Sequence, residues 1–366
     1  MSPLARFIDY FRDSGDYSVS VPPLDGALRP NERLETAIAV IHAPEPDNLV
    51  SFAGGVVFSS AESLFRIEPG SDPDSRATAL PLHRLPAAVT ALTSHGDALA
   101  IGMEKGGIAV IGGRHDGAIF GAMDGMTINC PTALAFLDAD TLLVANGSST
   151  NPPSRWKSDL LEGGASGTVA RIDLVTGRVT RLAAGLAYPL GLLPLADGGL
   201  LVAESWRHRL IRIDRAGKIS AVLENLPAYP ARLAPCRDGG AWLALFAPRR
   251  RLVEFVLREP AYRGRMMTEI PSEYWIAPTL RPMASFLEPL QGGMLKQLAR
   301  LKPWAPSRSY GLVARLDANF RPVQSLHSRA DGCRHGVRSV LEISEGLLAA
   351  SAGADAVVLV PQAQEH

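Results

Sequence analysis

The chain has few cysteines, few lysines and no excess of either charge. Cys130, Cys236 and Cys333 are widely spaced, odd in number and lack CxxC spacing, so neither a disulfide framework nor a zinc site is expected. The 37 basic and 37 acidic residues cancel, which gives no attraction toward nucleic acid. Only five of the basic residues are lysines, a bias typical of GC-rich, bacterial genomes. We therefore predict no nucleic-acid partner.

Long apolar runs are also absent. The amino-terminal segment places Leu4, Phe7 and Phe11 at helical spacing, but acidic and basic residues interrupt the pattern, which is unlike the apolar region of a signal peptide. No stretch reaches the roughly 20 apolar residues of a membrane helix. We therefore expect a cytoplasmic protein without a membrane span, in which residues 1–33 form a helical arm before the main domain.

An internal repeat dominates the rest of the sequence. Each copy has a short apolar run, a turn with Asp or Gly, and a second apolar run, which predicts two antiparallel strands joined by a tight turn. The six copies are Pro46–Ala61, Ala87–Gly102, Pro131–Asn146, Pro189–Glu204, Pro230–Leu245 and Gly336–Ser351. Further strands follow most copies, and four strands in about 40 residues is the size of a propeller blade.

These copies predict an all-β fold, a six-bladed β-propeller with four-stranded blades over residues 34–366. The last copy is followed by only one more strand, whereas Thr36–His42 has strand character before the first copy. We expect this N-terminal strand to close the ring. Long intervals after the third and fifth copies locate insertions at residues 147–166 and 246–309. Both follow a second strand and are predicted to form a lid at one mouth of the channel, with a short helix at Met294–Leu301.

Three runs of the sequence resemble strictosidine-synthase-like proteins, whose relatives include gluconolactonases and paraoxonases. The runs are Tyr188–Asp214, Leu226–Leu245 and Tyr310–Gly332, and their order and spacing agree with the family from about Glu35 to Pro361. The resemblance implies the same propeller fold and a small-molecule enzyme whose site lies in the central channel.

The resemblance also implies, for many relatives, a Ca²⁺ ion at the channel floor that is held by a Glu and several Asn side chains. Asp47, Thr132, Leu190 and Arg232 replace those residues here. Because a guanidinium repels a cation, we predict no Ca²⁺ in the usual position and no other cofactor. The catalytic Glu of strictosidine synthase aligns with Arg338, which cannot act as a base at neutral pH, so its condensation reaction is not expected.

The starts of the inner strands should face one another across the channel. With the neighbouring His335, they bring together Asp47, Asn48, Arg232 and Arg338. Two forked guanidiniums suit a carboxylate, a phosphate or a sugar acid, which they bind in bidentate fashion. In the alternative interpretation, the two arginines pair with Asp47 and Glu204 as buried ion pairs that fill the channel in place of a metal.

His335 is the candidate general base, because an imidazole near a carboxylate can activate water against a lactone or ester. His327 and Asp331, in the same segment, are predicted to be structural parts of a turn. Glu204 and Asn146 share one repeat position near the mouth, which favours contact with a ligand. Aromatic walls are predicted from Trp206, Trp156, Tyr274 and Trp275, although packing between sheets is the other interpretation of such rings. Tyr310 is a further candidate for contact with the substrate.

Two kinds of function fit these residues. The first is a metal-independent lactonase or ester hydrolase for an anionic or sugar-derived metabolite, with His335 as base, Arg232 and Arg338 as anion clamps, and Glu204 in the same site. The second is a non-catalytic propeller that binds an acidic small molecule. A C–N bond-forming or cyclising enzyme is a further alternative, since a fold does not determine a reaction. The expected partner is a small molecule in each case, and the sequence leaves the oligomeric state open.

Overall fold

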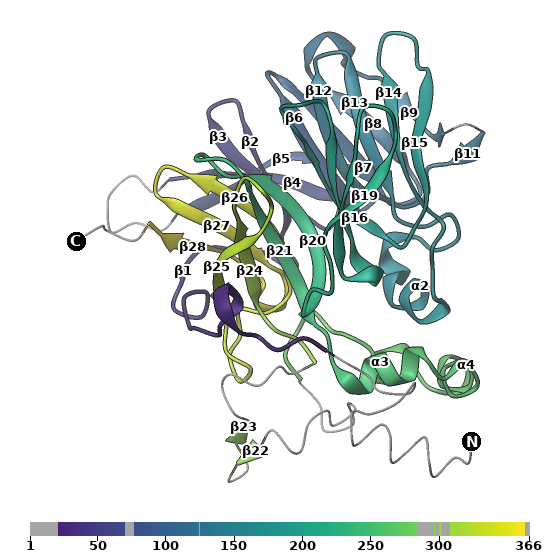
Figure 1. Ribbon diagram of the computed structural model, residues 1–366. Coiled ribbons are helices and arrows are strands. Elements are labelled where there is room, and N and C mark those ends of the chain that lie inside the picture. The colour runs from purple at the N-terminus through teal and green to yellow at the C-terminus, as the bar shows by residue number, and fades with distance from the viewer. Residues whose placement is uncertain are drawn as a thin grey trace.

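The computed structural model describes residues 21–69, 77–123, 125–283, 288, 296–297, 300–301 and 308–362. The helix predicted near the start of the N-terminal arm lies outside these residues. The described chain forms a ring of six four-stranded antiparallel sheets (Figure 1). The prediction of a six-bladed β-propeller is therefore confirmed.

Each of the first three blades runs outward from its innermost strand. The first blade contains β2 (Asp47–Phe52), β3 (Gly55–Ser60), β4 (Ser63–Glu68) and β5 (Thr78–Arg84). The second contains β6 (Val89–His95), β7 (Ala98–Met103), β8 (Gly107–Ile111) and β9 (Ile119–Phe120). The third contains β12 (Pro131–Asp138), β13 (Thr141–Asn146), β14 (Gly167–Asp173) and β15 (Val179–Leu186).

The other three blades repeat this plan, and the last one takes its outer strand from the start of the domain. The fourth contains β16 (Pro189–Pro194), β17 (Leu200–Glu204), β18 (Arg209–Ile213) and β19 (Ile219–Leu223). The fifth contains β20 (Ala228–Pro235), β21 (Ala241–Pro248), β24 (Leu312–Leu316) and β25 (Pro322–His327). The sixth contains β26 (Val337–Ile343), β27 (Gly346–Ser351), β28 (Ala356–Pro361) and β1 (Ile38–His42).

The N-terminal strand closes the ring as predicted. β1 pairs with β28 in antiparallel register, with Ile38 opposite Leu359 and His42 opposite Ala356. Backbone hydrogen bonds thus join the beginning of the domain to its end. This pairing covers an edge that the sixth blade would otherwise expose.

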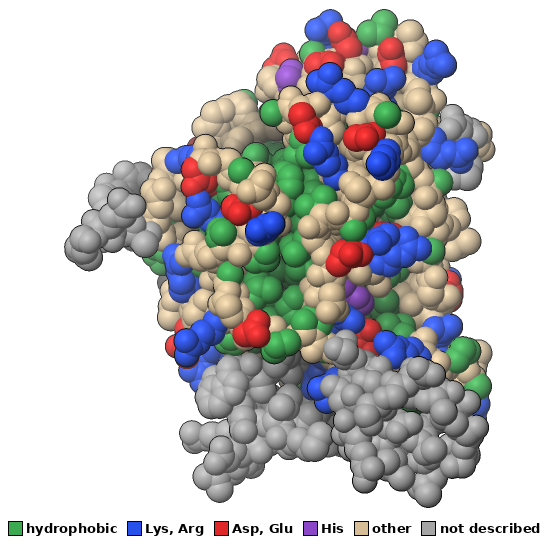
Figure 2. All heavy atoms as spheres, in the orientation of Figure 1, with side chains coloured by type: hydrophobic (Ala, Val, Ile, Leu, Met, Phe, Trp, Pro, Cys, Tyr) green, Lys and Arg blue, Asp and Glu red, His purple; other side chains and the backbone are tan. Residues whose placement is uncertain are grey.

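The hydrophobic core lies between neighbouring sheets. Leu143 and Val169 of the third blade, for example, belong to one buried cluster with Val202 and Ile211 of the fourth. Burial on both faces explains why the strands read as apolar runs rather than as alternating patterns. On the face shown in Figure 2, hydrophobic side chains lie in the furrow between sheets, and charges of both signs are scattered around it.

A register shift occurs near the start of the inner strand in every blade. Such a bulge interrupts the hydrogen-bond ladder and redirects a side chain. The residues inside these shifts include Asn48, Thr90, Thr132, Leu190, Arg232 and Arg338. In five blades the bulged residue lines the channel cavity, and in the first blade Asp47, which directly precedes the shift, lines it instead.

Both insertions lie on the same side of the propeller (Figure 1). The first contains η3 (Pro153–Arg155) and α2 (Trp156–Glu162). The second contains α3 (Arg251–Leu257), α4 (Pro260–Glu269) and η5 (Ser272–Tyr274). Outside the insertions, the shorter elements are η1 (Gly26–Leu28), η2 (Gly113–His115), β10 (Ala122–Met123), β11 (Met126–Thr127), η4 (Ser205–Arg207) and η7 (Ala352–Ala354).

The helix predicted at Met294–Leu301 is wrong for the residues described there. β22 (Lys296–Gln297) pairs instead with β23 (Arg300–Leu301). Eight residues at helical spacing do not determine a helix, because nucleation is costly and a short helix depends on packing. Among the described residues, no helix is long and apolar enough to cross a membrane.

Candidate functional site

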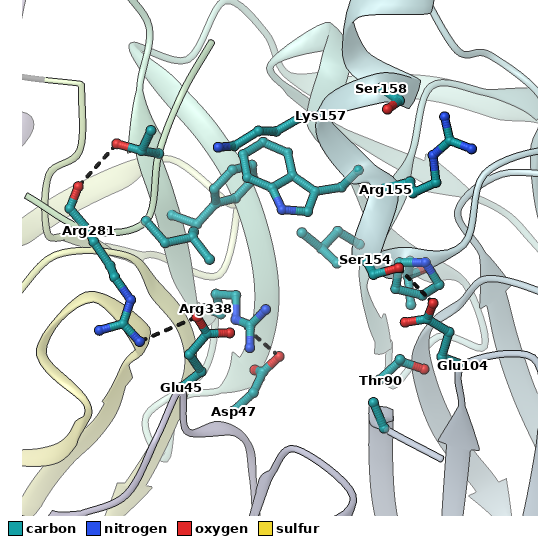
Figure 3. A pocket seen from close by; sticks show the side chains of 18 of the residues that line it. Glu45, Asp47, Thr90, Glu104, Ser154, Arg155, Lys157, Ser158, Arg281 and Arg338 are labelled. Carbon is teal, nitrogen blue, oxygen red and sulfur yellow. Dashed lines mark hydrogen bonds and ion pairs between the residues drawn. The ribbon is translucent and has the colours of Figure 1, made fainter. Parts of the chain in front are cut away.

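A cavity of about 1240 Å³ lies at the channel mouth on the side of the insertions. The starts of the inner strands form its floor and contribute Asp47, Thr90, Thr132, Arg232 and Arg338. Residues 153–158 and 272–275 of the two insertions line its upper part. In Figure 3, Arg338 and Asp47 lie below Lys157, with Glu104 and Ser154 on the adjoining wall. The two insertions thus cover the channel as a lid would.

Arg232 crosses the floor of the channel and connects four blades. It makes a bidentate ion pair with Asp47, in which Nε donates to Oδ1 and Nη2 donates to Oδ2, each over 2.9 Å. Nη2 also donates to the carbonyl oxygen of Thr90 over 2.8 Å, and Nη1 donates to that of Thr132. These carbonyl groups belong to residues inside the bulges, where the ladder is interrupted. One guanidinium therefore satisfies backbone acceptors that the bulges leave free.

Asp47 is held in its ionised form. Burial by itself raises its pKa, but the positive charges of Arg232 and Arg338 outweigh this effect, and hydrogen bonds from Arg232 and from the Asn48 backbone add to it. The resulting pKa is about 2, below the ordinary value of 3.8. Asp47 is therefore a fixed negative charge, and the pair it forms with Arg232 is neutral as a unit.

The residues at this floor do not fit a bound cation. Both oxygens of Asp47 accept hydrogen bonds from Arg232, and the positive charge of that guanidinium repels a cation. Thr132 donates its hydroxyl to the Ala145 and Pro189 carbonyl groups instead of offering it to the channel. Across the described ranges, no group of three His, Cys, Asp or Glu side chains is placed to hold a metal ion.

Arg338 differs from Arg232 in having most of its hydrogen-bonding capacity unused. Its Nε lies 3.4 Å from Oδ2 of Asp47, a carboxylate that Arg232 already binds with both oxygens. Nε is buried without a hydrogen bond, and no other hydrogen bond to this guanidinium is found in the described part of the chain. The side chain is 28% exposed and borders the cavity (Figure 3). Arg338 can thus bind an anion in two-pronged geometry.

His335 does not reach the cavity. Its exposed fraction is zero, and its Nε2 donates to the carbonyl oxygen of Arg329 over 2.7 Å. Nδ1 is 2.7 Å from Oγ of Ser309, so the neutral ring accepts from that hydroxyl. Burial lowers the pKa of His335, which favours this neutral form. The geometry therefore gives it a structural role and does not support its predicted role as a general base.

Glu204 is also enclosed, by arginines of its own blade. Its Oε1 is 2.5 Å from Nη1 of Arg207 and its Oε2 is 2.6 Å from Nε of Arg209. The sequence suggested that Glu204 would pair across the channel or touch a ligand, but its partners lie in its own blade and it is not among the residues that line the cavity. The reason is local: η4 turns the chain immediately after β17 and brings Arg207 back over the carboxylate. Of the alternative interpretation, in which the two channel arginines pair with Asp47 and Glu204, only the part with Asp47 is present, and both arginines lie against that carboxylate.

Three other predicted ligand contacts are occupied within the protein. Asn48 donates its amide to Oγ of Ser59, and Asn146 donates to the Ser148 carbonyl and accepts from the Cys130 backbone. The hydroxyl of Tyr310 lies 3.3 Å from Nδ1 of His327. None of Asn48, Asn146 and Tyr310 is among the residues that line the cavity. A side chain near the channel end of an inner strand therefore does not necessarily line the cavity.

The remaining predicted aromatic residues do line the cavity. Trp206, Tyr274 and Trp275 all border it. The indole nitrogen of Trp206 donates to Oδ1 of Asp159 over 2.8 Å, and that of Trp275 donates to the Ile270 carbonyl. These bonds fix the two rings in place, so that the cavity has rigid apolar walls.

Most charged residues that line the cavity were missed by the sequence reasoning, among them Glu104 and Lys157. Glu104 follows the second strand of the second blade, and its Oε1 accepts a hydrogen bond from Oγ of Ser154 over 2.6 Å. Lys157 lies on α2 in the first insertion. Each borders the cavity. Glu104 sits two positions after the repeat position of Glu204, so the repeat alignment contained a signal for it. Lys157 could have been noticed as the only lysine between Lys105 and Lys218.

The chain is similar to known proteins at two levels. No family model matches it. Over 125 residues it is 28% identical to adipocyte plasma membrane-associated protein of Danio rerio, a match that covers 30% of each chain. The human protein of the same name is 29% identical over 106 residues, or 26% of each chain. The matches therefore span less than a third of the length of these relatives.

Solved structures extend the likeness over most of the chain. A gluconolactonase from Xanthomonas campestris has a TM-score of 0.54 and 12% identity, covering 89% of this chain and 88% of its own. A candidate gluconolactonase has a TM-score of 0.51 and 11% identity, covering 90% and 94% respectively. Identities this low show a shared propeller fold. The strictosidine-synthase-like assignment stays a prediction.

Proposed function

We propose that the chain is a metal-independent lactonase or ester hydrolase that acts on an anionic small molecule in this cavity. The observation that carries the proposal is Arg338, a guanidinium with unused donors at the floor of a cavity with fixed aromatic walls. Hydrolysis of a lactone or ester develops negative charge on the carbonyl oxygen, and a preorganised donor in a partly desolvated site stabilises that charge. The gluconolactonase names of the structural neighbours are consistent with this reaction class.

Glu104 is the carboxylate that we assign as general base. Ser154 donates to one of its oxygens over 2.6 Å, which leaves the other oxygen to accept a proton from water. In the proposed step, water adds to the carbonyl carbon while its proton passes to Glu104. The ring or ester C–O bond then breaks, and the proton is returned to the departing alkoxide oxygen. The paired Arg232 and Asp47 keep the floor rigid and take no proton.

The test is a screen of lactones and aryl esters with wild type, Arg338→Met and Glu104→Gln. We expect kcat/KM to fall about 100-fold on loss of the Arg338 donors, and kcat to fall about 100-fold or more in Glu104→Gln. Glu68→Gln, a carboxylate change outside the cavity, is the matched control and should retain wild-type rates. Equal rates in Glu104→Gln and wild type would remove Glu104 from the mechanism. Absence of turnover with every lactone and ester would overturn the hydrolase proposal.

A non-catalytic binder is the second candidate, and the enclosure of His335 favours it. With both ring nitrogens engaged, the cavity lacks the histidine base that the sequence suggested. A binder would be stabilised by acidic ligands through Arg338 without releasing any product. Thermal shifts with sugar acids that are lost in Arg338→Met, together with no turnover, would identify this function.

A further inference from the structure

A strip of three aromatic rings runs along the cavity wall, and we call Tyr188, Trp206 and Trp156 the aromatic strip. Tyr188 is stacked on Trp206 with 4.4 Å between ring centroids, and Trp206 lies 6.2 Å from Trp156. All three border the cavity. The strip begins near the floor, because Tyr188 directly precedes the start of the inner strand β16. It ends on α2 in the first insertion, where Trp156 is the first residue of the helix.

Lys157 stands at the upper end of this strip. Its Nζ lies 5.7 Å from the centre of the Trp156 ring, and in Figure 3 the side chain extends over the cavity. Within the described chain, no hydrogen bond or ion pair is found for this amine. Burial lowers its pKa, and the positive charge of Arg308 acts in the same direction, whereas Glu288 and Glu273 act against both.

The charges around Lys157 leave its amine available. Glu288, the carboxylate with the larger effect on the pKa of Lys157, already pairs with Arg308 over 2.5 Å. Glu273 is exposed to solvent on η5, where water screens its charge. A ligand anion would therefore relieve the burial and repulsion that disfavour the ammonium. The cavity thus has one cation at each end of an apolar strip.

We propose that Lys157 is a second anion-binding residue and that the ligand is a ring-bearing carboxylate. Its ring lies on the aromatic strip, its carboxylate meets Lys157, and its reacting ester or lactone group meets Arg338. This inference rests on the proposed function for the placement of the reacting group at Arg338. A ring is favoured because flat aromatic walls separate the two cations, and stacking on such walls is most effective for planar groups.

The test compares phenyl acetate with 4-acetoxybenzoate, which differ only by a carboxylate on the ring. For wild type we expect kcat/KM to be about 10- to 100-fold higher for 4-acetoxybenzoate, the range of one charge-assisted hydrogen bond. In Lys157→Met this ratio should fall to about one, chiefly through KM. Lys157→Arg should keep most of the preference. Lys218→Met, a change of an exposed lysine on another blade, should leave the ratio as in wild type.

Binding of 4-hydroxybenzoate, measured by calorimetry, separates this inference from the proposed function. Binding that weakens at least 10-fold in Lys157→Met without hydrolysis of either ester would support the carboxylate site and remove the hydrolase assignment. Hydrolysis with the same substrate ratio in Lys157→Met and wild type would overturn the role of Lys157 and leave the hydrolase assignment standing.

Discussion

Replacing Arg232 with methionine removes the cation that neutralises Asp47 while keeping an unbranched side chain of similar reach. Four hydrogen bonds are lost, two to Asp47 and one each to the Thr90 and Thr132 carbonyl groups. Asp47 is 5% exposed, so water cannot readily replace these donors. Nε of Arg338 remains 3.4 Å from Oδ2 of Asp47, so the positive charge of Arg338 still offsets part of the negative charge of Asp47. The variant therefore tests how much of the fold depends on this guanidinium.

The magnitude follows from the burial and the pKa of Asp47. Its folded pKa of about 2 lies below the ordinary 3.8. The difference stabilises the native state by about 2 kcal/mol above pH ~4, and this contribution is lost as the pH falls toward 2. Breaking a buried pair by removing one partner costs about 3–5 kcal/mol. Because Arg338 is still present in Arg232→Met, we expect the free energy of unfolding to fall by about 3 kcal/mol at pH 7, the lower end of this range.

Urea unfolding at pH 7 and pH 4 measures this loss. Urea is preferable to guanidinium chloride, since free guanidinium could occupy the vacated position. In Arg232→Met, burial should raise the pKa of Asp47, so protonation makes the deficit smaller at pH 4. The double variant Asp47→Asn, Arg232→Met should recover part of the loss at pH 7, because no unpaired charge remains.

The matched control is Arg84→Met, which removes an exposed ion pair of the same length. Arg84 lies 2.9 Å from Glu62, and its side chain is 79% exposed. Such a pair contributes little, so its loss should change the free energy of unfolding by less than about 1 kcal/mol. If Arg232→Met were no more destabilising than this control, or if the double variant were less stable than the single one, the reasoning would be refuted.

Two further predictions concern buried groups outside the cavity. Glu204→Gln should lower the free energy of unfolding by about 2 kcal/mol, because Arg207 and Arg209 lose the charge of a fully buried carboxylate. An unchanged free energy of unfolding in urea would contradict this prediction. Burial raises the pKa of the Cys130 thiol to about 12, so a thiol reagent at pH 8 should label Cys130 only after unfolding. Cys333 is exposed, and its replacement by serine should remove the thiol that reacts first in the native protein.

The fold could be predicted from the sequence because its determinants are local and repeated. Each copy from Pro46–Ala61 to Gly336–Ser351 contains two apolar runs and a turn, and six such copies determine six blades. Strand character at Thr36–His42 and a shortened last copy together indicated the closing strand, which the pairing of β1 with β28 confirms. The same alignment brought Asp47, Arg232 and Arg338 to the starts of inner strands near the channel.

The partners of those residues could not be predicted in the same way. A bulge at the start of each inner strand changes which face a side chain occupies, and alternating patterns carry no record of it. The sequence therefore did not show that Arg232 would take both oxygens of Asp47 and leave Arg338 largely unpaired. It also did not show that the Arg329 carbonyl and the Ser309 hydroxyl would enclose His335.

The sequence by itself determined the architecture and the identity of the charges near the channel. Only the tertiary structure decided which of those charges are available to a ligand. Glu204 is neutralised by Arg207 of η4 and Arg209 of β18, which follow it within five residues, whereas Lys157 reaches the cavity from the first insertion. Whether a charged side chain can bind a ligand depends on its burial and on the partners that compete for it. Closure of the ring brings those partners together.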